Sequence, residues 1–184
     1  MTTDIPQSVQ VQRDLTLDHI DRWLKDVLRP EWWVLVGLII VCIVVWVVLL
    51  DKKRLRETLL YAAFLSILGL GMAEYGEELI LWDYPVDLIA VFPPLTSINL
   101  LLLPLSYSLA YQYCNTSRLF FAAVLGITTV LCFVIEPLLS TVDLYNLINW
   151  QYWWSFPFYA AGALLVRKIT VMIFSIEKRA QEGR

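Results

Sequence analysis

The segment from Trp32 to Leu50 contains 19 consecutive residues without a charged side chain, most of them Val, Ile and Leu. About 20 apolar residues cross a bilayer core that is roughly 30 Å thick. The segment is not a cleavable signal peptide, because 31 residues precede it and no small-residue cleavage site follows it. Hydrophobic residues make up 59% of the whole chain and charged residues only 17%. Since soluble domains carry about a quarter charged residues, the chain is predicted to be an integral membrane protein.

Three further uncharged segments continue the pattern. Thr58 to Ala73 is the second predicted span, and it can lengthen only by taking in the three glutamates that follow. The third is predicted from Pro94 to Tyr113, because proline suits the first turn of a helix, with a kink expected at Pro104. The fourth runs from Arg118 to Leu139, and its helix is expected to end at Glu136-Pro137.

The fifth span has two possible entry points. Ser155 is a candidate N-cap with Pro157 just inside the helix, but this entry leaves Arg167-Lys168 within the hydrocarbon. Entry near Trp150 places the same pair at the membrane boundary, so that Ile169 to Ile176 forms an interfacial extension. We prefer entry near Trp150, since it needs no charge in hydrocarbon. The transmembrane domain is therefore predicted to cover residues 32–176.

Basic residues predict the orientation of the spans. Ten Lys and Arg residues fall in the first loop, the third loop and the C-terminal end, and four fall in the N-terminal tail. Cytoplasmic segments are enriched in Lys and Arg. Residues 1–31 are therefore predicted to form an extracytoplasmic tail and residues 177–184 a cytoplasmic tail.

The N-terminal tail contains one amphipathic segment. Its apolar residues follow helical spacing on one stripe: Ile20, Trp23, Leu24, Val27 and Leu28. Thr16 is a candidate N-cap and Pro30 a candidate stop, whereas residues before Val11 are expected to be loose. Such a helix fits the outer membrane surface, and a helix that binds a partner would have the same pattern.

Carboxylates gather on the predicted outer side. Glu74, Glu77 and Glu78 share one helix face, and Glu136 ends the fourth span. The outer loops add three more acids and contain no Lys or Arg; these acids are Asp83, Asp87 and Asp143. Such a group could attract Ca²⁺ or Mg²⁺, or hold a proton on a buried Glu. Alternatively, these residues are solvated interfacial acids that end helices.

Other polar and aromatic residues indicate packing more than chemistry. Asn99 is the deepest polar side chain of the third span; it could line a substrate path or bond to a neighbouring helix. Aromatic residues are predicted to form an anchoring belt at the outer face: Trp82, Tyr84, Trp150, Tyr152, Trp153 and Trp154. The three cysteines, Cys42, Cys114 and Cys132, fit no metal or redox spacing. No nucleophile–base set is present, so neither an enzyme nor a cofactor is expected.

The chain also resembles a known family. Short motifs carry the likeness: Trp82-Asp83-Tyr84-Pro85, Leu103-Pro104, Tyr111-Gln112-Tyr113, Glu136-Pro137 and Trp150-Gln151-Tyr152-Trp153-Trp154-Ser155-Phe156-Pro157. Between about Leu59 and Ile169, the sequence is similar to small uncharacterised multispan membrane proteins of spore-forming Gram-positive bacteria. The resemblance implies a bacterial cytoplasmic membrane and a bundle of four or five helices. The long charged N-terminal tail departs from that family.

Together these patterns predict an all-α transmembrane helical bundle with about five spans and an amphipathic interfacial helix before them. The expected function is that of a non-catalytic membrane component, which packs against other membrane proteins or a second copy within the lipid bilayer. No basic patch suggests nucleic acid as a partner. The alternative is a small cation- or proton-coupled transporter that uses Glu74, Glu136 and Asn99.

Overall fold

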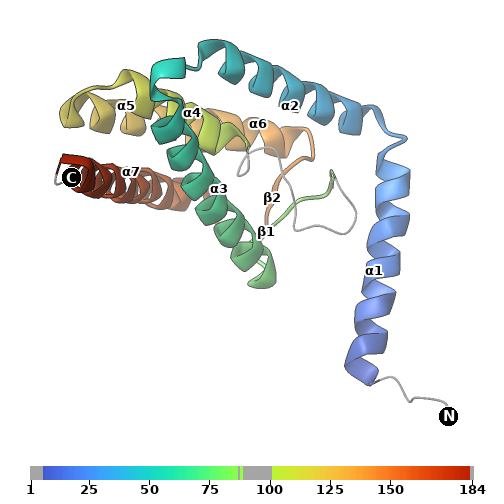
Figure 1. Ribbon diagram of the computed structural model, residues 1–184. Coiled ribbons are helices and arrows are strands. Elements are labelled where there is room, and N and C mark those ends of the chain that lie inside the picture. Colours follow the sequence, from blue (N-terminus) through green and yellow to red (C-terminus); the bar gives the residue numbers. More distant parts are fainter. Residues whose placement is uncertain (1–5, 87, 89–100, 183–184) are drawn as a thin grey trace.

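A computed structural model describes residues 6–86, 88 and 101–182 (Figure 1). The chain folds as an all-α helical bundle with one short two-stranded ribbon. In chain order the elements are α1 (Gln7–Asp26), α2 (Pro30–Leu49), the 3₁₀ turn η1 (Lys52–Arg54), α3 (Leu55–Glu78), β1 (Trp82–Asp83), α4 (Leu103–Tyr113), α5 (Ser117–Val130), the π-helical turn η3 (Leu131–Ile135), α6 (Glu136–Thr141), β2 (Asn146–Leu147) and α7 (Tyr152–Glu182).

Four helical segments in the described part are long and apolar enough to cross a membrane: Trp32–Leu49, Lys52–Glu78, Ser117–Thr141 and Tyr152–Glu182. Their length and composition suggest a membrane protein. The second segment takes in Glu74, Glu77 and Glu78, as its predicted lengthening required. Of the third predicted span only the part from residue 101 is described, and its predicted start at Pro94 lies outside the described residues.

Helices α3, α4, α5 and α7 enclose the main core. Tyr61, Tyr107, Phe120 and Val124 are fully buried there, and Ala163 of α7 packs among them. Two hydrogen bonds join helices through this core: the Tyr61 hydroxyl donates to the Ala163 carbonyl at 3.0 Å, and the Tyr107 hydroxyl lies 2.7 Å from that of Thr128. The bundle is therefore held by large aromatic side chains whose polar ends are also bonded.

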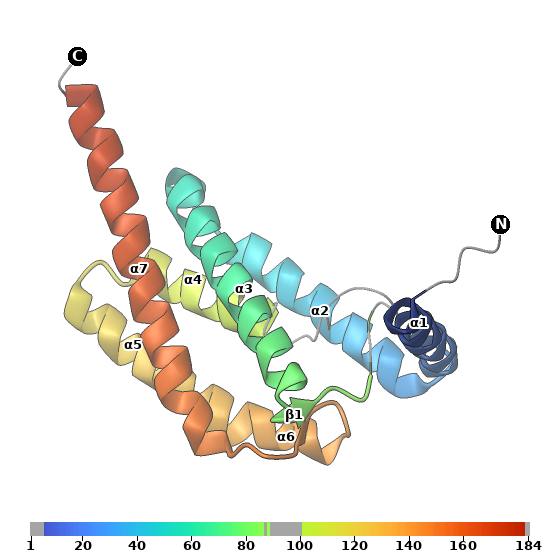
Figure 2. The same ribbon diagram turned by 90° about the horizontal axis from the view of Figure 1, so that it is seen from below.

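The bundle has two chemically different ends, which Figure 2 shows at opposite sides. At the ribbon end, β1 pairs antiparallel with β2 next to α6 and the start of α7. At the basic end lie η1 and the beginning of α3, and the last turns of α7 extend beyond the other helices. The Trp23 indole of α1 donates to the Leu88 carbonyl at 3.0 Å, so α1 touches the segment that follows the ribbon.

Helix α1 begins earlier than predicted, and it ends at Asp26, before the predicted stop at Pro30. It begins at Gln7, so residues 7–10, which were expected to be loose, are helical. Thr16 does not cap it; the Thr16 hydroxyl donates to the Gln12 carbonyl one turn earlier, which satisfies the side chain within a helix. Pro30 starts α2, where its missing N–H costs nothing. The predicted N-cap was therefore wrong.

The fourth span does not end at Glu136-Pro137. The chain widens into the π turn η3 just before the proline, and the Glu136 N–H donates to the Leu131 carbonyl, five residues back. The π turn comes before Pro137, which cannot donate a backbone hydrogen bond. The helix then continues as α6 to Thr141. Pro104 has a similar setting, because the π-helical residues 101–102 are separated from it by a single residue.

Helix α7 begins at Tyr152, closer to the preferred entry near Trp150 than to the alternative. Ser155 lies inside the helix rather than at its cap, and Pro157 follows within the helix. The Arg167 guanidinium stacks over Phe120 at 4.4 Å, level with the first turn of α5. The helix then continues without a break to Glu182.

Candidate functional site

The ribbon end is built around a tryptophan that packs on a glycine. A Cβ atom on Gly76 would lie 1.8 Å from Cζ2 of Trp82, so only glycine lets the indole pack this closely on α3. Trp82 is 8% exposed and stacks edge-on against Trp150 at 5.3 Å. Tyr84 and Tyr145 are buried beside it in the same cluster. The short ribbon thereby brings aromatic side chains from two loops onto the end of α3.

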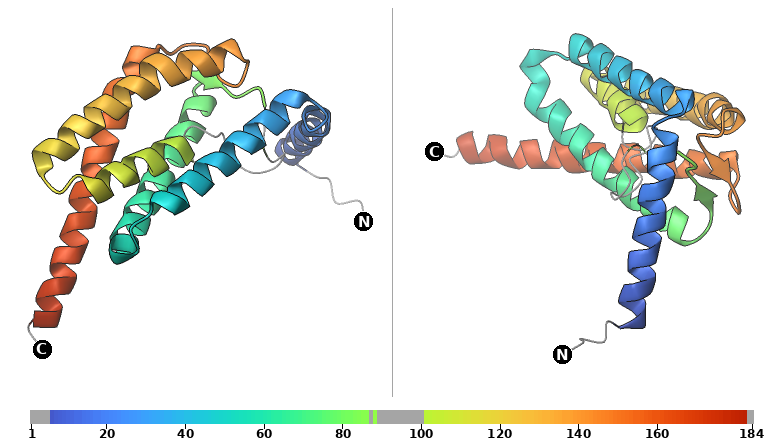
Figure 3. Two further views of the ribbon diagram at one scale, coloured as in Figure 1. Left: turned by 90° about the horizontal axis from the view of Figure 1, so that it is seen from above. Right: turned by 90° about the vertical axis from the view of Figure 1, so that its right-hand side faces the viewer.

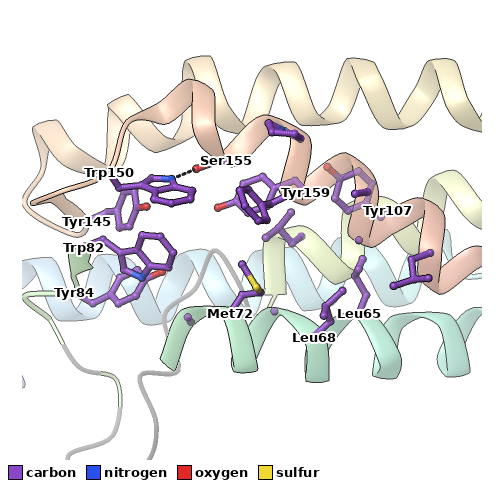
Figure 4. Close-up of a pocket in the computed structure, with 18 residues that line it drawn as sticks. Leu65, Leu68, Met72, Trp82, Tyr84, Tyr107, Tyr145, Trp150, Ser155 and Tyr159 are labelled. Atoms are coloured by element: carbon purple, nitrogen blue, oxygen red, sulfur yellow. Dashed lines mark hydrogen bonds between the residues drawn. The ribbon is translucent and has the colours of Figure 1, made fainter. Parts of the chain in front are cut away.

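A pocket of about 660 Å³ lies next to this cluster, between α3 and α7 (Figure 4). Its walls are mostly apolar, and Leu68 and Met72 of α3 face Phe158 and Leu165 of α7 across it. These four side chains are themselves exposed on the bundle surface. The pocket therefore opens sideways, on the apolar flank that a membrane-embedded bundle presents to lipid.

Hydrogen-bonding groups gather at one end of the pocket. The Trp150 indole N–H donates to the Ser155 hydroxyl at 3.0 Å, the bond that Figure 4 marks. The Ser155 hydroxyl in turn donates to Oε2 of Glu136 at 3.3 Å. The indole N–H of Trp82 is buried in the wall and has no hydrogen-bond partner among the described residues. A buried donor without an acceptor is costly and is a ready contact for a ligand oxygen.

Glu136 lies directly behind this polar end. The π turn of η3 precedes it, and its side chain is fully buried, with Ser155 and Tyr159 as polar neighbours. Its second oxygen, Oε1, has no hydrogen-bond partner, and no Lys or Arg pairs with it in the described part of the chain. Burial raises the pKa of Tyr145 above its ordinary value, so this loop phenol keeps its proton.

The other predicted site residues do not join Glu136. Glu74 and Glu78 are exposed on the last turns of α3, and Glu77 is half-buried. Within the described ranges, no group of three or more His, Cys, Asp and Glu residues could hold a metal ion. Asn99 lies outside the described residues, as does Asp87. Of the predicted site residues that the structure describes, only Glu136 is linked to the pocket, by its hydrogen bond with Ser155.

Sequence reasoning missed the pocket and gave its aromatic residues a different role. Trp82 and Tyr84 were expected in an interfacial belt, yet both are buried. Trp153 and Trp154 are exposed, as the belt requires. The spacing of Gly76 and Trp82 was the available signal, because a glycine one loop before a tryptophan permits close packing between them.

The chain matches no family model, no curated protein and no solved structure. The family suggested by its short motifs therefore stays a prediction. The arrangement combines an apolar pocket, an unpaired indole donor and a buried carboxyl group that is one hydrogen bond away from the pocket residue Ser155.

Proposed function

We propose that this protein is a non-catalytic, multipass membrane protein that binds a largely apolar ligand in the pocket between α3 and α7. The observation that carries the proposal is the unpaired Trp82 indole N–H in the wall of an otherwise apolar pocket. Ligand sites typically measure about 300–1,000 Å³ and combine apolar walls with a few polar groups. The pocket has both properties.

The chemistry of the lining suggests the class of ligand. The rim residues Leu68, Met72 and Phe158 suit a hydrocarbon chain that enters from the bilayer. At the polar end, the Trp82 indole N–H would donate to an oxygen of the ligand. A long-chain lipid with an uncharged carbonyl, ester or hydroxyl group fits this pattern, since no Lys or Arg lines the pocket among the described residues.

A second role as a packing partner is supported by α2. Among the described side chains of this helix only Leu35 is buried, although the helix is strongly apolar. Figure 3 shows α2 running along one side of the bundle. This exposed surface supports contact with other membrane proteins or a second copy, the role expected from the sequence.

The transporter alternative is supported by Glu136. This residue is fully buried, lacks one hydrogen bond and contacts Ser155, which lines the pocket. Ionisable residues within membrane segments often carry protons or ions. A proton-coupled role would use Glu136 as the site that gains and loses the proton. We further propose a bacterial cytoplasmic membrane as the location, with the N-terminus outside and the C-terminus inside.

Photo-crosslinking tests the ligand proposal. A diazirine-bearing methyl palmitate, which carries an uncharged ester, is added to the protein in lipid nanodiscs, and labelled residues are mapped by mass spectrometry. We expect labels on Tyr84 and Tyr145, which are buried from bulk lipid but line the pocket. The Ala161→Phe variant narrows the pocket and should reduce these labels several-fold, whereas Ala122→Phe on α5 should leave them unchanged.

Labels on the exposed α2 residue Val44 report ordinary lipid contact and should not change in either variant. Two results would overturn the proposal: no label on Tyr84 or Tyr145 in the wild type, or equal labelling of these tyrosines in the two alanine variants.

A further inference from the structure

A second hollow, of about 640 Å³, lies at the basic end of the bundle, between the start of α3 and the last turns of α7. Five basic residues line this basic groove: Lys52, Lys53, Arg54, Arg56 and Lys178. They come from segments more than 100 residues apart, joined by an ion pair of 2.8 Å between Arg56 and Glu177. The fold, and not the local charge run alone, creates this concentration of positive charge.

The acids in the basic groove do not neutralise it. Glu57 pairs with Arg54 at 3.2 Å, and Glu177 pairs with Arg56. Lys52 and Lys53 are exposed and form no ion pair with any described residue. The basic groove therefore keeps an excess of ammonium groups with free hydrogen-bond donors.

The helix that precedes the basic groove indicates where the groove lies relative to the membrane. Helix α2 ends at Leu49, three residues before Lys52, so the basic side chains follow directly on a predicted span. Leu55 and Phe174 also line the groove, and Leu59 is exposed one helical turn beyond Leu55. Positive charge thus borders an apolar surface, as at the boundary between lipid headgroups and acyl chains.

We infer that the basic groove binds the headgroup of an anionic phospholipid, with its phosphate on Lys52, Lys53 and Arg56 and its acyl chain along Leu55 and Leu59. Basic residues next to a membrane span attract the headgroups of anionic lipids. A phosphate oxygen accepts charge-assisted hydrogen bonds from both ammonium and guanidinium groups. This site is independent of the pocket at the ribbon end.

The test compares lipids by their effect on thermal unfolding of the full chain in detergent. Phosphatidylglycerol is added to one sample, phosphatidylcholine with the same acyl chains to another, and inorganic phosphate to a third. We expect phosphatidylglycerol to raise the Tm well above the other two additions. The double variant Lys52→Gln/Lys53→Gln should lose this specific rise, and Lys52→Arg/Lys53→Arg should keep it.

The control Arg13→Gln/Lys25→Gln removes the same charge from the exposed helix α1 and should keep the full rise. Native mass spectrometry of each variant counts retained phosphatidylglycerol as a second readout and should follow the same order. Equal effects of the two lipids would overturn the inference, as would an unchanged lipid effect in the glutamine groove variant. A rise produced equally by inorganic phosphate would reassign the basic groove to soluble phosphates.

Discussion

Glu136 is fully buried, yet one of its carboxyl oxygens has no hydrogen-bond partner in the described structure. Burying an unpaired charge costs several kcal/mol, whereas a neutral carboxyl group can itself donate a hydrogen bond. Its partner Ser155 also accepts the Trp150 indole N–H, so the carboxyl group supports a chain of three polar side chains. We infer that Glu136 is neutral in the folded state and orders the polar end of the pocket.

Two substitutions test this inference. Glu136→Gln keeps the shape, an acceptor and a donor, so the variant should melt within a few degrees of wild type. Glu136→Leu removes the acceptor for Ser155 and should lower the free energy of unfolding by about 1–3 kcal/mol. Thermal unfolding in detergent measures both effects.

Other outcomes assign Glu136 differently. If both variants melt like wild type, the residue is a solvated acid and the transporter alternative loses its support. If Gln fails as badly as Leu and added Ca²⁺ or Mg²⁺ raises the Tm of the wild type, the partner of Glu136 is a cation.

At the scale of elements, α2 is attached to the bundle through the end of α4. The Trp46 indole donates to the Ser108 hydroxyl at 2.8 Å. The Gln112 amide donates to the Leu49 carbonyl and its oxygen accepts from the Asp51 N–H, both at 2.9 Å. Because a helix leaves its last carbonyls unpaired, Gln112 acts as the C-terminal cap of α2 from another helix.

Gln112→Leu should therefore loosen the end of α2. It removes both hydrogen bonds at a site where Gln112 is 4% exposed, so we expect a loss of about 1–3 kcal/mol in the free energy of unfolding. Hydrogen exchange should become faster at the Asp51 amide, which loses its acceptor. The same substitution at the exposed Gln12 of α1 serves as the control. Unchanged exchange at Asp51 in Gln112→Leu would show that α2 is held by other contacts.

For the whole molecule, the distribution of basic residues predicts the orientation in the membrane. Ten Lys and Arg residues against four predict that the loop at Lys52 is cytoplasmic and that both loops of the ribbon are outside. The structure supplies exposed positions for a labelling test: Leu55 in the first loop region, Asp83 in β1 and Ile148 after β2.

In a variant without the three native cysteines, we introduce Leu55→Cys, Asp83→Cys or Ile148→Cys and label intact cells with a membrane-impermeant thiol reagent. Positions 83 and 148 should react and position 55 should not, whereas all three should react in permeabilised cells. Reaction at 55 alone in intact cells would reverse the predicted orientation.

Hydropathy along the chain was enough to predict a helical membrane protein. Long uncharged runs such as Trp32 to Leu50 suffice for this, because in lipid a helix satisfies its backbone hydrogen bonds within one segment. The three glutamates after Ala73 were correctly placed at the end of the second span, because the uncharged run stops just before them. The helix limits at Thr16 and Pro137 were misjudged, and so was the exposure of Trp82 and Tyr84.

Tertiary structure decided those limits and both proposed sites. Pro137 continues a helix because the π turn comes before it, and Ser155 faces Glu136 instead of capping α7. The pocket depends on the fit of Trp82 onto Gly76, and the basic groove on the ion pair between Arg56 and Glu177. Helix propensity and hydropathy are summed along neighbouring residues, whereas these sites arise from side chains that only packing brings together.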